Sequence, residues 1–208
     1  MRAARALRLL AGVAGVAALG LVPAVTGATA AASPPAPVAA HQHQHQHQHQ
    51  HQAATARPSA VQVARMRAAT ASFHNIANAE DAGYGLLHDL AGLTCIAMPG
   101  EGGMGVHFVK GPLVADPGLD IRHPEALVYA PERDGTLRLA ALEFIVDKAA
   151  WDAHHAGPPR LFGGRAFDLT PAPNRFGLDP FYSQHVWIWK NNPAGVLSMW
   201  NPRVHCPK

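Results

Sequence analysis

The sequence has little charge, no apolar run long enough to span a membrane, and none of the common hydrolase motifs. Asp, Glu, Lys and Arg make up 15% of the 208 residues. An apolar run extends from Leu9 to Val22, which is shorter than the roughly 20 residues that a membrane-spanning helix needs. No H-E-x-x-H, G-x-S-x-G or S-x-x-K segment is present, so the usual signatures of zinc peptidases and serine hydrolases are missing.

The first thirty residues are typical of a secretory signal peptide. Three arginines form a charged start, the apolar run follows, and Pro23 ends it. Residues 28–30 are an A-x-A pattern that signal peptidase can cut. We therefore expect residues 1–30 to be removed on export, leaving a mature chain outside the cytoplasm, secreted or in the cell envelope, with no stable membrane insertion. An uncleaved N-terminal anchor is the alternative.

Export also removes the basic character of the chain. The sequence holds 17 Lys and Arg against 14 Asp and Glu, and three of the arginines lie in the export segment. The basic side chains that remain equal the acidic ones in number and are scattered singly. A nucleic-acid-binding surface would keep a basic stripe, so we expect no nucleic-acid partner.

Residues 31–57 form a linker composed mostly of Ala, Pro, His, Gln, Ser and Thr, with no aromatic residue. This composition buries too little apolar surface to offset the entropy of ordering, which predicts a disordered tether. Six histidines in it alternate with glutamine: His41, His43, His45, His47, His49 and His51. Imidazole binds zinc, copper and nickel, so one interpretation is an auxiliary metal-binding tract. The other is a repeat that arose by replication slippage and that a disordered linker tolerates.

Residues 58–208 are long enough for one globular domain with its own core. The two cysteines of the chain, Cys95 and Cys206, both lie in it. In an exported protein with no other thiol they are expected to pair, closing a loop of about 110 residues that contributes about 4–5 kcal/mol in the chain-entropy model. Two thiolates on a metal ion are the less typical alternative, because zinc sites show closely spaced ligand pairs.

A helix is expected at the start of this domain. Ser59 to Gln62 fits a capping box, and apolar residues then recur at three- and four-residue spacing as far as Tyr84. Glu80 falls on this apolar stripe, where a carboxylate must be paired or lie at the edge of the packed region. It is a possible extra metal ligand.

Strands are expected after the helix. Four segments are short, apolar and rich in β-formers: Val106–Lys110, Ala126–Ala130, Leu137–Val146 and His185–Lys190. Residues 131–135 predict a hairpin turn between the second and third strands, a short helix is expected near 148–155, and a long loop over 156–183. The expected fold is α+β, with one long N-terminal helix packed on an antiparallel sheet of four to five strands and long Pro- and Gly-rich loops.

Gly100 to Gly105 matches the spacing G-x-G-x-x-G. The dinucleotide-binding fingerprint requires a strand before these glycines and a helix after them. Here a β-rich segment follows, so we exclude a dinucleotide site. The glycines are expected to form a flexible turn or to allow close packing of the backbone.

Three polar residues interrupt the apolar strand segments: His107, Glu143 and His185. Burying such groups costs several kcal/mol unless they are paired or bound to a metal. Contributed by three strands of one sheet, they can meet on one face, and two histidines with a carboxylate form a ligand set for zinc, copper or iron. The alternative is a buried hydrogen-bonded network that only fixes the core. Strand alternation further predicts Trp187 and Trp189 beside His185 as an aromatic wall.

Five further histidines of the domain are expected on the surface: His74, His123, His154, His155 and His205.

Two segments carry a resemblance. They are Gly102-Gly103-Met104-Gly105-Val106-His107, and the C-terminal stretch that begins at His185-Val186-Trp187-Ile188-Trp189 and closes with Trp200-Asn201-Pro202-Arg203-Val204-His205-Cys206. Together they resemble a family of uncharacterised exported bacterial proteins, over about residues 61–206. The resemblance implies export but no activity, fold or ligand, and the His-Gln tract departs from the pattern.

Three functions are compatible with these features. The first is an extracytoplasmic metal-binding protein that uses His107, Glu143 and His185. The second is a small secreted metal-dependent enzyme, in which the same residues line an open cleft. The third is a non-catalytic binding or structural module with an exposed surface formed by Trp187, Trp189 and Trp200.

Overall fold

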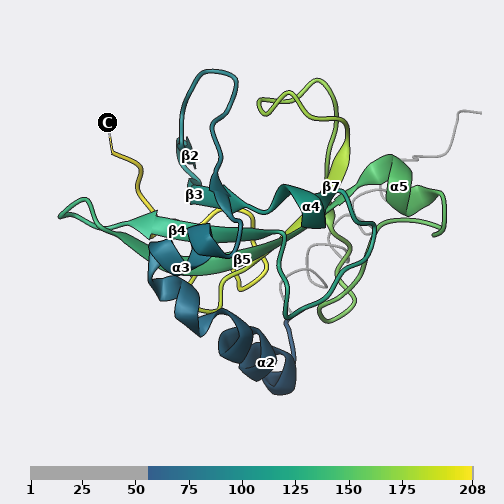
Figure 1. Ribbon diagram of the computed structural model, residues 1–208, viewed down its shortest axis with the longest axis horizontal. Helices are drawn as coiled ribbons and strands as arrows, with labels where there is room; N and C mark the ends of the chain where they lie inside the picture. Colours follow the sequence, from purple (N-terminus) through teal and green to yellow (C-terminus); the bar gives the residue numbers. More distant parts are fainter. Residues whose placement is uncertain (1–55, 208) are drawn as a thin grey trace, which may run out of the picture. The chain divides into compact units, whose positions relative to one another are not determined.

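The computed structural model describes residues 56–207, which form an α+β domain around one antiparallel sheet of seven strands (Figure 1). The export segment, the His-Gln tract and all but the last two residues of the linker lie outside the described residues. None of the described helices is long and apolar enough to cross a membrane.

The N-terminal helical segment is broken, so the expectation of one long helix is wrong. It consists of α2 (Ala60–Thr70), a 3-10 turn η1 (Ala71–His74) and α3 (Ile76–Asp81). The capping box is confirmed, because the Gln62 amide donates to the Ser59 hydroxyl at 3.2 Å and the Ser59 amide to the Gln62 side chain at 2.8 Å. The break lies at Asn75, which has an extended backbone and caps α3 by accepting from the Ala77 amide. Asparagine is a strong N-cap, and here it starts a new helix.

The strands alternate with short helices and loops. Their bounds are β1 (Gly85–Leu86), β2 (Cys95–Met98), β3 (Gly102–Val109), β4 (Ala126–Pro131), β5 (Leu137–Asp147), β6 (Asp168–Thr170) and β7 (Phe181–Val186), with α4 (Gly111–Val114) and α5 (Lys148–Asp152) between them. The sheet order is β1-β3-β4-β5-β7-β6, and β2 pairs with β3 beyond the residues that pair with β1. The hairpin turn between β4 and β5 is confirmed, with the Gly135 amide donating to the Glu132 carbonyl.

Two strand expectations need correction. The sheet has seven strands, since three very short ones at its margins (β1, β2 and β6) gave no alternating pattern to detect. The last strand ends at Val186, whereas the sequence predicted a strand over 185–190. After Val186 the regular ladder ends, because the amides of Trp189 and Lys190 both donate to the same acceptor, the Ala140 carbonyl of β5.

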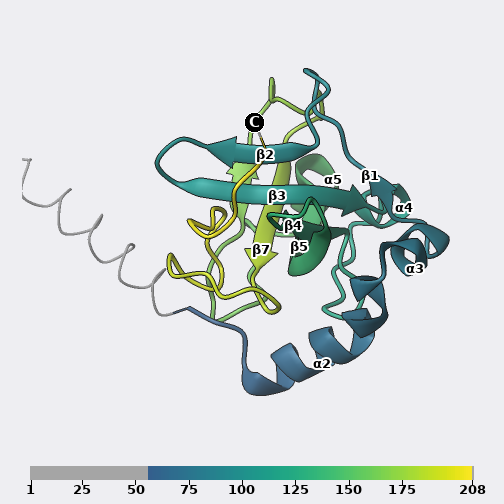
Figure 2. The same cartoon turned by 90° about the vertical axis from the view of Figure 1, so that its left-hand side faces the viewer.

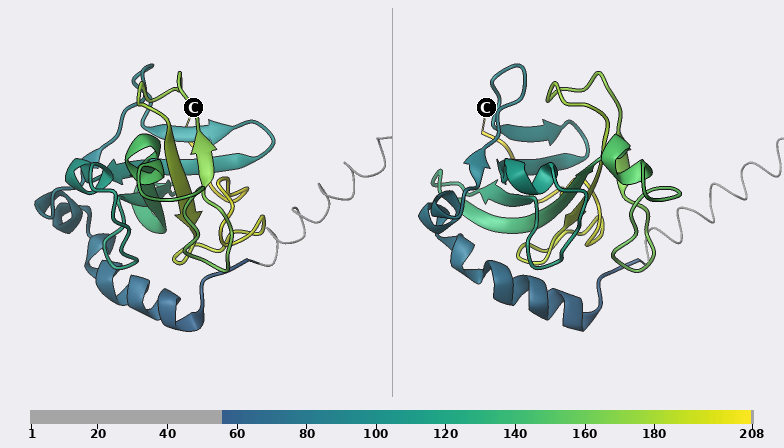
Figure 3. Two further views of the ribbon diagram at one scale, coloured as in Figure 1. Left: turned by 90° about the vertical axis from the view of Figure 1, so that its right-hand side faces the viewer. Right: turned by 45° about the vertical axis from the view of Figure 1, so that its right-hand side comes forward.

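The two faces of the sheet are different. The helix-side face packs against α2 and α3, which lie along one side of the sheet (Figures 1 and 3). It contributes the main core: Val106, Phe108, Leu127, Tyr129, Leu142, Phe144, Val146, Tyr182 and Val186, together with Met66 and Ala79 of the helices. The opposite face, here called the site face, carries small or medium residues such as Ala126, Val128 and Ala141. Alternation along each strand produces this division.

The glycine-rich start of β3 packs against the C-terminal segment, residues 199–207. Gly103 and Asn201 form an isolated bridge with two backbone hydrogen bonds, of 3.1 and 3.0 Å. A Cβ on Gly103 would lie 2.9 Å from the Val204 carbonyl oxygen, so only glycine fits there. The predicted Cys95–Cys206 disulfide is present and fastens the same segment to β2. Close backbone packing therefore explains the glycines at the start of β3. They lie in a strand, whereas the dinucleotide fingerprint requires glycines between a strand and a helix.

We predict that Gly103→Ala lowers the free energy of unfolding by about 1–3 kcal/mol, because its Cβ forces apart two backbone segments held together by hydrogen bonds. Gly111→Ala is the matched control, since a Cβ there meets nothing within 4 Å. Both are measured by equilibrium urea unfolding with the disulfide intact. Equal stability of the two variants would contradict the close approach at Gly103.

Candidate metal centre

Three strands bring the candidate ligands to the site face. Glu143 on β5 and His185 on β7 are directly opposite each other in an antiparallel ladder. His107 lies on β3, which is separated from β5 by β4, and its cross-strand partner is Val128. Figure 2 shows β3 running across the direction of β7, as the twist of a sheet requires. Because of this twist, side chains of β3 and β7 that lie on the site face incline toward each other.

Small side chains on the intervening strands leave room for the imidazole of His107. On β4, Ala126 is opposite Glu143 and Val128 is opposite Ala141. All three of these apolar residues are fully buried. Because none of them extends far above the sheet, the His107 ring can reach across β4 toward the carboxylate. The site thus depends on the small volume of the side chains that β4 and β5 place on the site face.

The side chains of His107, Glu143 and His185 converge. The Nε2 atoms of the two histidines are 3.2 Å apart, and Nε2 of His107 is 3.5 Å from Oε2 of Glu143. Nδ1 of His185 lies 3.6 Å from the other carboxylate oxygen. One ligand atom from each residue lies within 4.8 Å of the other two, so the group can hold a metal ion. The sequence prediction that these residues meet on one face is confirmed.

The electrostatics of the group follow from its burial. The exposed fractions are 3% for His107, 5% for Glu143 and 1% for His185. Desolvation lowers the pKa of His107 to about 4 and that of His185 to about 3, since it disfavours the charged imidazolium. Burial raises the pKa of Glu143, which His107 and the Ser183 hydroxyl counteract. Both imidazoles are therefore neutral at pH 7, the form in which histidine binds metals.

The distances bear on the choice between a metal ligand set and a hydrogen-bonded network. Two ligands at about 2.1 Å from one ion, in near-tetrahedral arrangement, lie about 3.4 Å apart. Hydrogen bonds of imidazole to an ionised carboxylate are shorter, about 2.7–2.9 Å. The contacts of Glu143 at 3.5 and 3.6 Å match the first spacing, whereas the 3.2 Å between the two Nε2 atoms is also compatible with a hydrogen bond between the imidazoles. Within residues 56–207 the buried Nδ1 of His107 has no hydrogen-bond partner, but Nε2 is the nitrogen that faces the other two residues, so this observation fits both interpretations.

A cavity of about 630 Å³ lies over this group, on the site face. His107, Glu143 and Ser183 line it, whereas His185 is sealed behind them. Its other walls are mainly apolar and come from β3, α4, β5, β7, the loop before β7 and the C-terminal segment. A metal ion held by the three residues would therefore have an open position toward the cavity.

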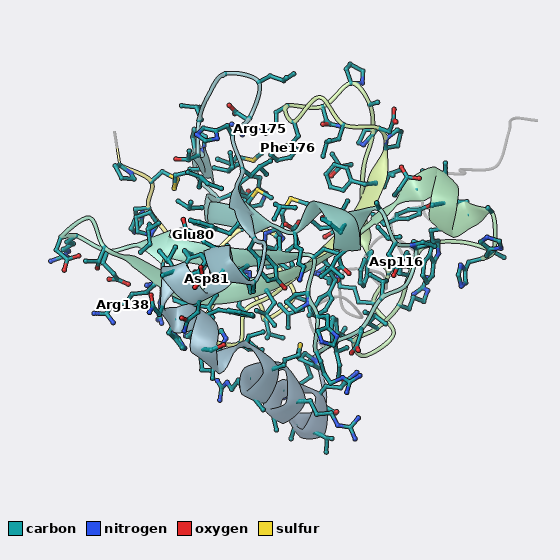
Figure 4. The ribbon with its side chains drawn as sticks, in the orientation of Figure 1. Glu80, Asp81, Asp116, Arg138, Arg175 and Phe176 are labelled. Atoms are coloured by element: carbon teal, nitrogen blue, oxygen red, sulfur yellow. A yellow bond between two sulfur atoms is a disulfide. The ribbon has the colours of Figure 1, made fainter. Side chains whose placement is uncertain are left out.

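Glu80 and the five histidines expected on the surface all lie away from this group. Glu80 is exposed on α3, which packs on the helix-side face, so its assignment as an extra ligand is wrong (Figure 4). Its place on the apolar stripe is explained by its position at the edge of the packed region. The five histidines expected on the surface, His74, His123, His154, His155 and His205, are all exposed. The histidines of the His-Gln tract lie outside the described residues.

The expected aromatic wall is only partly formed, because β7 ends before the tryptophans. Trp187 is buried and stacks on His185, with ring centroids 6.0 Å apart. Trp189 instead packs against His74 on the helix side. Trp200 lines the cavity. The three tryptophans thus occupy separate places and do not form the exposed aromatic surface that a binding module would use.

Two residues near the site were missed in the sequence. Ser183 was expected at the end of the loop over 156–183, yet it lies on β7 two residues before His185, on the same face. Glu125 is 1% exposed at the start of β4, and its carboxylate accepts the Ile145 amide at 3.0 Å. Desolvation, with smaller contributions from Glu143 and Asp116, raises the pKa of Glu125 to about 8. A carboxylate directly before an apolar strand was the available signal.

Comparisons with known proteins add no assignment to this geometry. No family model matches the chain, and no match was found among curated proteins or solved structures.

Glu125 predicts an unusual pH dependence of stability. The folded protein keeps this carboxyl protonated up to about pH 8, whereas the unfolded chain ionises it near 4.5. The folded state therefore binds more protons between these values, and stability falls as the pH rises through this window, by up to about 1.4 kcal/mol for each unit of pKa difference. Glu125→Gln, which keeps the acceptor for Ile145, should gain stability over the wild type progressively from pH 5 to pH 8.

Urea unfolding at several pH values measures this difference. The exposed Glu101→Gln is the matched control and should follow the wild type. A constant difference between Glu125→Gln and wild type across the window would show that Glu125 is ionised in the folded protein.

Proposed function

We propose that this protein is an extracytoplasmic metal-binding protein that holds one divalent transition metal ion with His107, Glu143 and His185. The single observation that carries the proposal is the convergence of three buried ligand atoms within 4.8 Å. Zinc, copper and iron all accept two imidazoles and a carboxylate.

The chemistry of the three groups supports this assignment. Neutral imidazoles bind a cation without first releasing a proton, and a dication would stabilise the ionised form of Glu143 that burial disfavours. Without a cation, the two imidazoles share a hydrogen bond of 3.2 Å, but the carboxylate lies 3.5 and 3.6 Å from their nitrogens, farther than in good hydrogen bonds. Binding a metal ion would resolve this cost.

The proposed location rests on two features. Residues 1–30 are expected to direct export, and the Cys95–Cys206 disulfide is typical of proteins that work in oxidising surroundings. In such a compartment the His-Gln tract would act as an auxiliary chelator that raises the local metal concentration near the domain.

The cavity favours a second candidate function, a metal-dependent enzyme. His107 and Glu143 line the cavity, so a fourth metal position would face space that a substrate can occupy. Catalytic zinc sites have three protein ligands and one such open position, where bound water is activated. This reading requires the same metal, and it adds a reaction whose substrate the site does not specify.

The proposal predicts about one metal ion per chain. We expect the exported form, with residues 41–52 deleted to remove the His-Gln tract, to bind stoichiometric zinc, copper or iron in elemental analysis of the purified protein. His107→Ala and His185→Ala should lose most of this metal, since each removes one of only three ligands.

His74→Ala, which removes an exposed histidine far from the site face, is the matched control and should retain the metal. Circular dichroism of each variant shows whether it is folded, and Glu143→Gln, nearly equal in shape to the wild type, provides a milder ligand change. Metal content well below stoichiometric in the wild type, or unchanged in folded His107→Ala, would leave the buried network as the better interpretation.

A further inference from the structure

The cavity above the candidate metal centre has the dimensions of a small-molecule site. Its volume of about 630 Å³ falls within the range of about 300–1,000 Å³ that is usual for ligand pockets. Three methionines line it, Met98, Met104 and Met199, whose flexible thioethers adapt to apolar ligands of varied shape. Phe176 and Phe181 add aromatic surface.

Most polar groups of the upper walls are already engaged elsewhere. Asp147 caps α5 by accepting from the Ala150 amide. The Asn174 side chain binds backbone groups of its own loop, from Pro171 to Leu178. Arg175 is paired with Asp89. The groups left to meet a polar atom of a ligand are those at the floor, His107 and Glu143 with the adjacent Ser183, and two on the upper walls. These two are the Thr170 hydroxyl and Nη1 of Arg175, which make no hydrogen bond within residues 56–207.

Two loops far apart in the sequence are joined beside this cavity. The Arg175 guanidinium lies 2.5 Å from the Asp89 carboxylate, and the Leu90 amide donates to the Arg175 carbonyl at 2.9 Å. Asp89 is itself held by the amides of Ala91 and Leu93. Figure 4 shows Arg175 and Phe176 on the loop before β7, where it meets the loop after β1. The cavity is therefore bounded by segments that the fold fixes in place, as expected of a preformed site.

The charge at the floor determines which head group fits. A dication on two neutral imidazoles and one carboxylate has a net charge of plus one, which a single anionic group at the open position would neutralise. Without the metal, the floor presents two neutral imidazoles and a carboxyl group, none of which attracts an anion. The charge at the floor of the cavity thus depends on the metal, whereas the apolar walls are the same with and without it.

We propose that this cavity binds an apolar small molecule with one terminal carboxylate, whose oxygen takes the open position on a metal held by His107, Glu143 and His185. The proposal rests on the metal-binding function proposed above, and it adds a class of ligand to it. The apolar walls contribute affinity, and the metal provides selectivity for the anionic head.

A displacement experiment separates these two contributions. The probe is the uncharged fluorophore N-phenyl-1-naphthylamine, added to the exported form lacking residues 41–52, either loaded with zinc or stripped with a chelator. We expect the probe to bind both forms equally. Decanoate should displace it at least about tenfold more effectively from the zinc form, whereas decanol, with the same chain and no charge, should displace it equally from both.

Two tryptophan substitutions test the location. Val114→Trp fills part of the cavity from α4 and should weaken binding of the probe and of decanoate at least about fivefold, a change of about 1 kcal/mol. Val61→Trp is the matched control, because Val61 is 60% exposed on α2 and does not line the cavity. Absence of probe binding, or equal binding by Val114→Trp and wild type, would overturn the assignment of the cavity.

The failures of the two proposals are distinguishable. If zinc binds stoichiometrically but decanoate displaces the probe equally from both forms, the carboxylate assignment is overturned and the metal-binding function stands. If none of zinc, copper and iron binds stoichiometrically, the metal-binding function fails and the metal-bound head group fails with it, whether or not the naphthylamine binds.

Discussion

Strand β5 distributes its side chains between two faces of the sheet, and both the core and the candidate site depend on this division. Leu142 and Phe144 face the helices, whereas Ala141, Glu143 and Ile145 face the cavity side. Alternation permits no intermediate arrangement, so a slip of one residue would exchange the two sets and place the carboxylate in the apolar core. The ladder with β7 fixes this register and sets the carboxylate opposite a histidine. One strand therefore supplies both stability and chemistry.

The site also depends on close packing around it. The C-terminal segment contributes Met199 and Trp200 to the cavity wall. It is held there by the bridge between Gly103 and Asn201 and by the disulfide to β2. The glycine-rich segment before His107 and the C-terminal segment, which together carry the resemblance noted in the sequence, are thus parts of one structural unit. Glycines in the first allow the second to approach, and the approach closes the space above the ligands.

The buried polar groups are costly for a domain of this size. Desolvation lowers the pKa of both site histidines and raises the pKa of Glu143 and of Glu125. Each shift means that the charged form of the group is destabilised by the fold. Clusters of such groups beside a cavity are more common at functional sites than in cores that serve stability alone. The proposed metal ion would offset the cost of burying His107, Glu143 and His185 together.

The sequence by itself determined the features that depend on near neighbours or on composition: the capping box at Ser59, the hairpin after β4, the α+β class and the pairing of the only two cysteines. It also indicated the three ligands, because a polar residue within an apolar strand is a local anomaly. Tertiary structure alone decided the end of β7 before the tryptophans and the burial of Glu125. It also decided that His107 and His185 touch, since sheet twist and the small residues on β4 bring together side chains 78 positions apart. Contacts of that range depend on the packing of segments that no local pattern records.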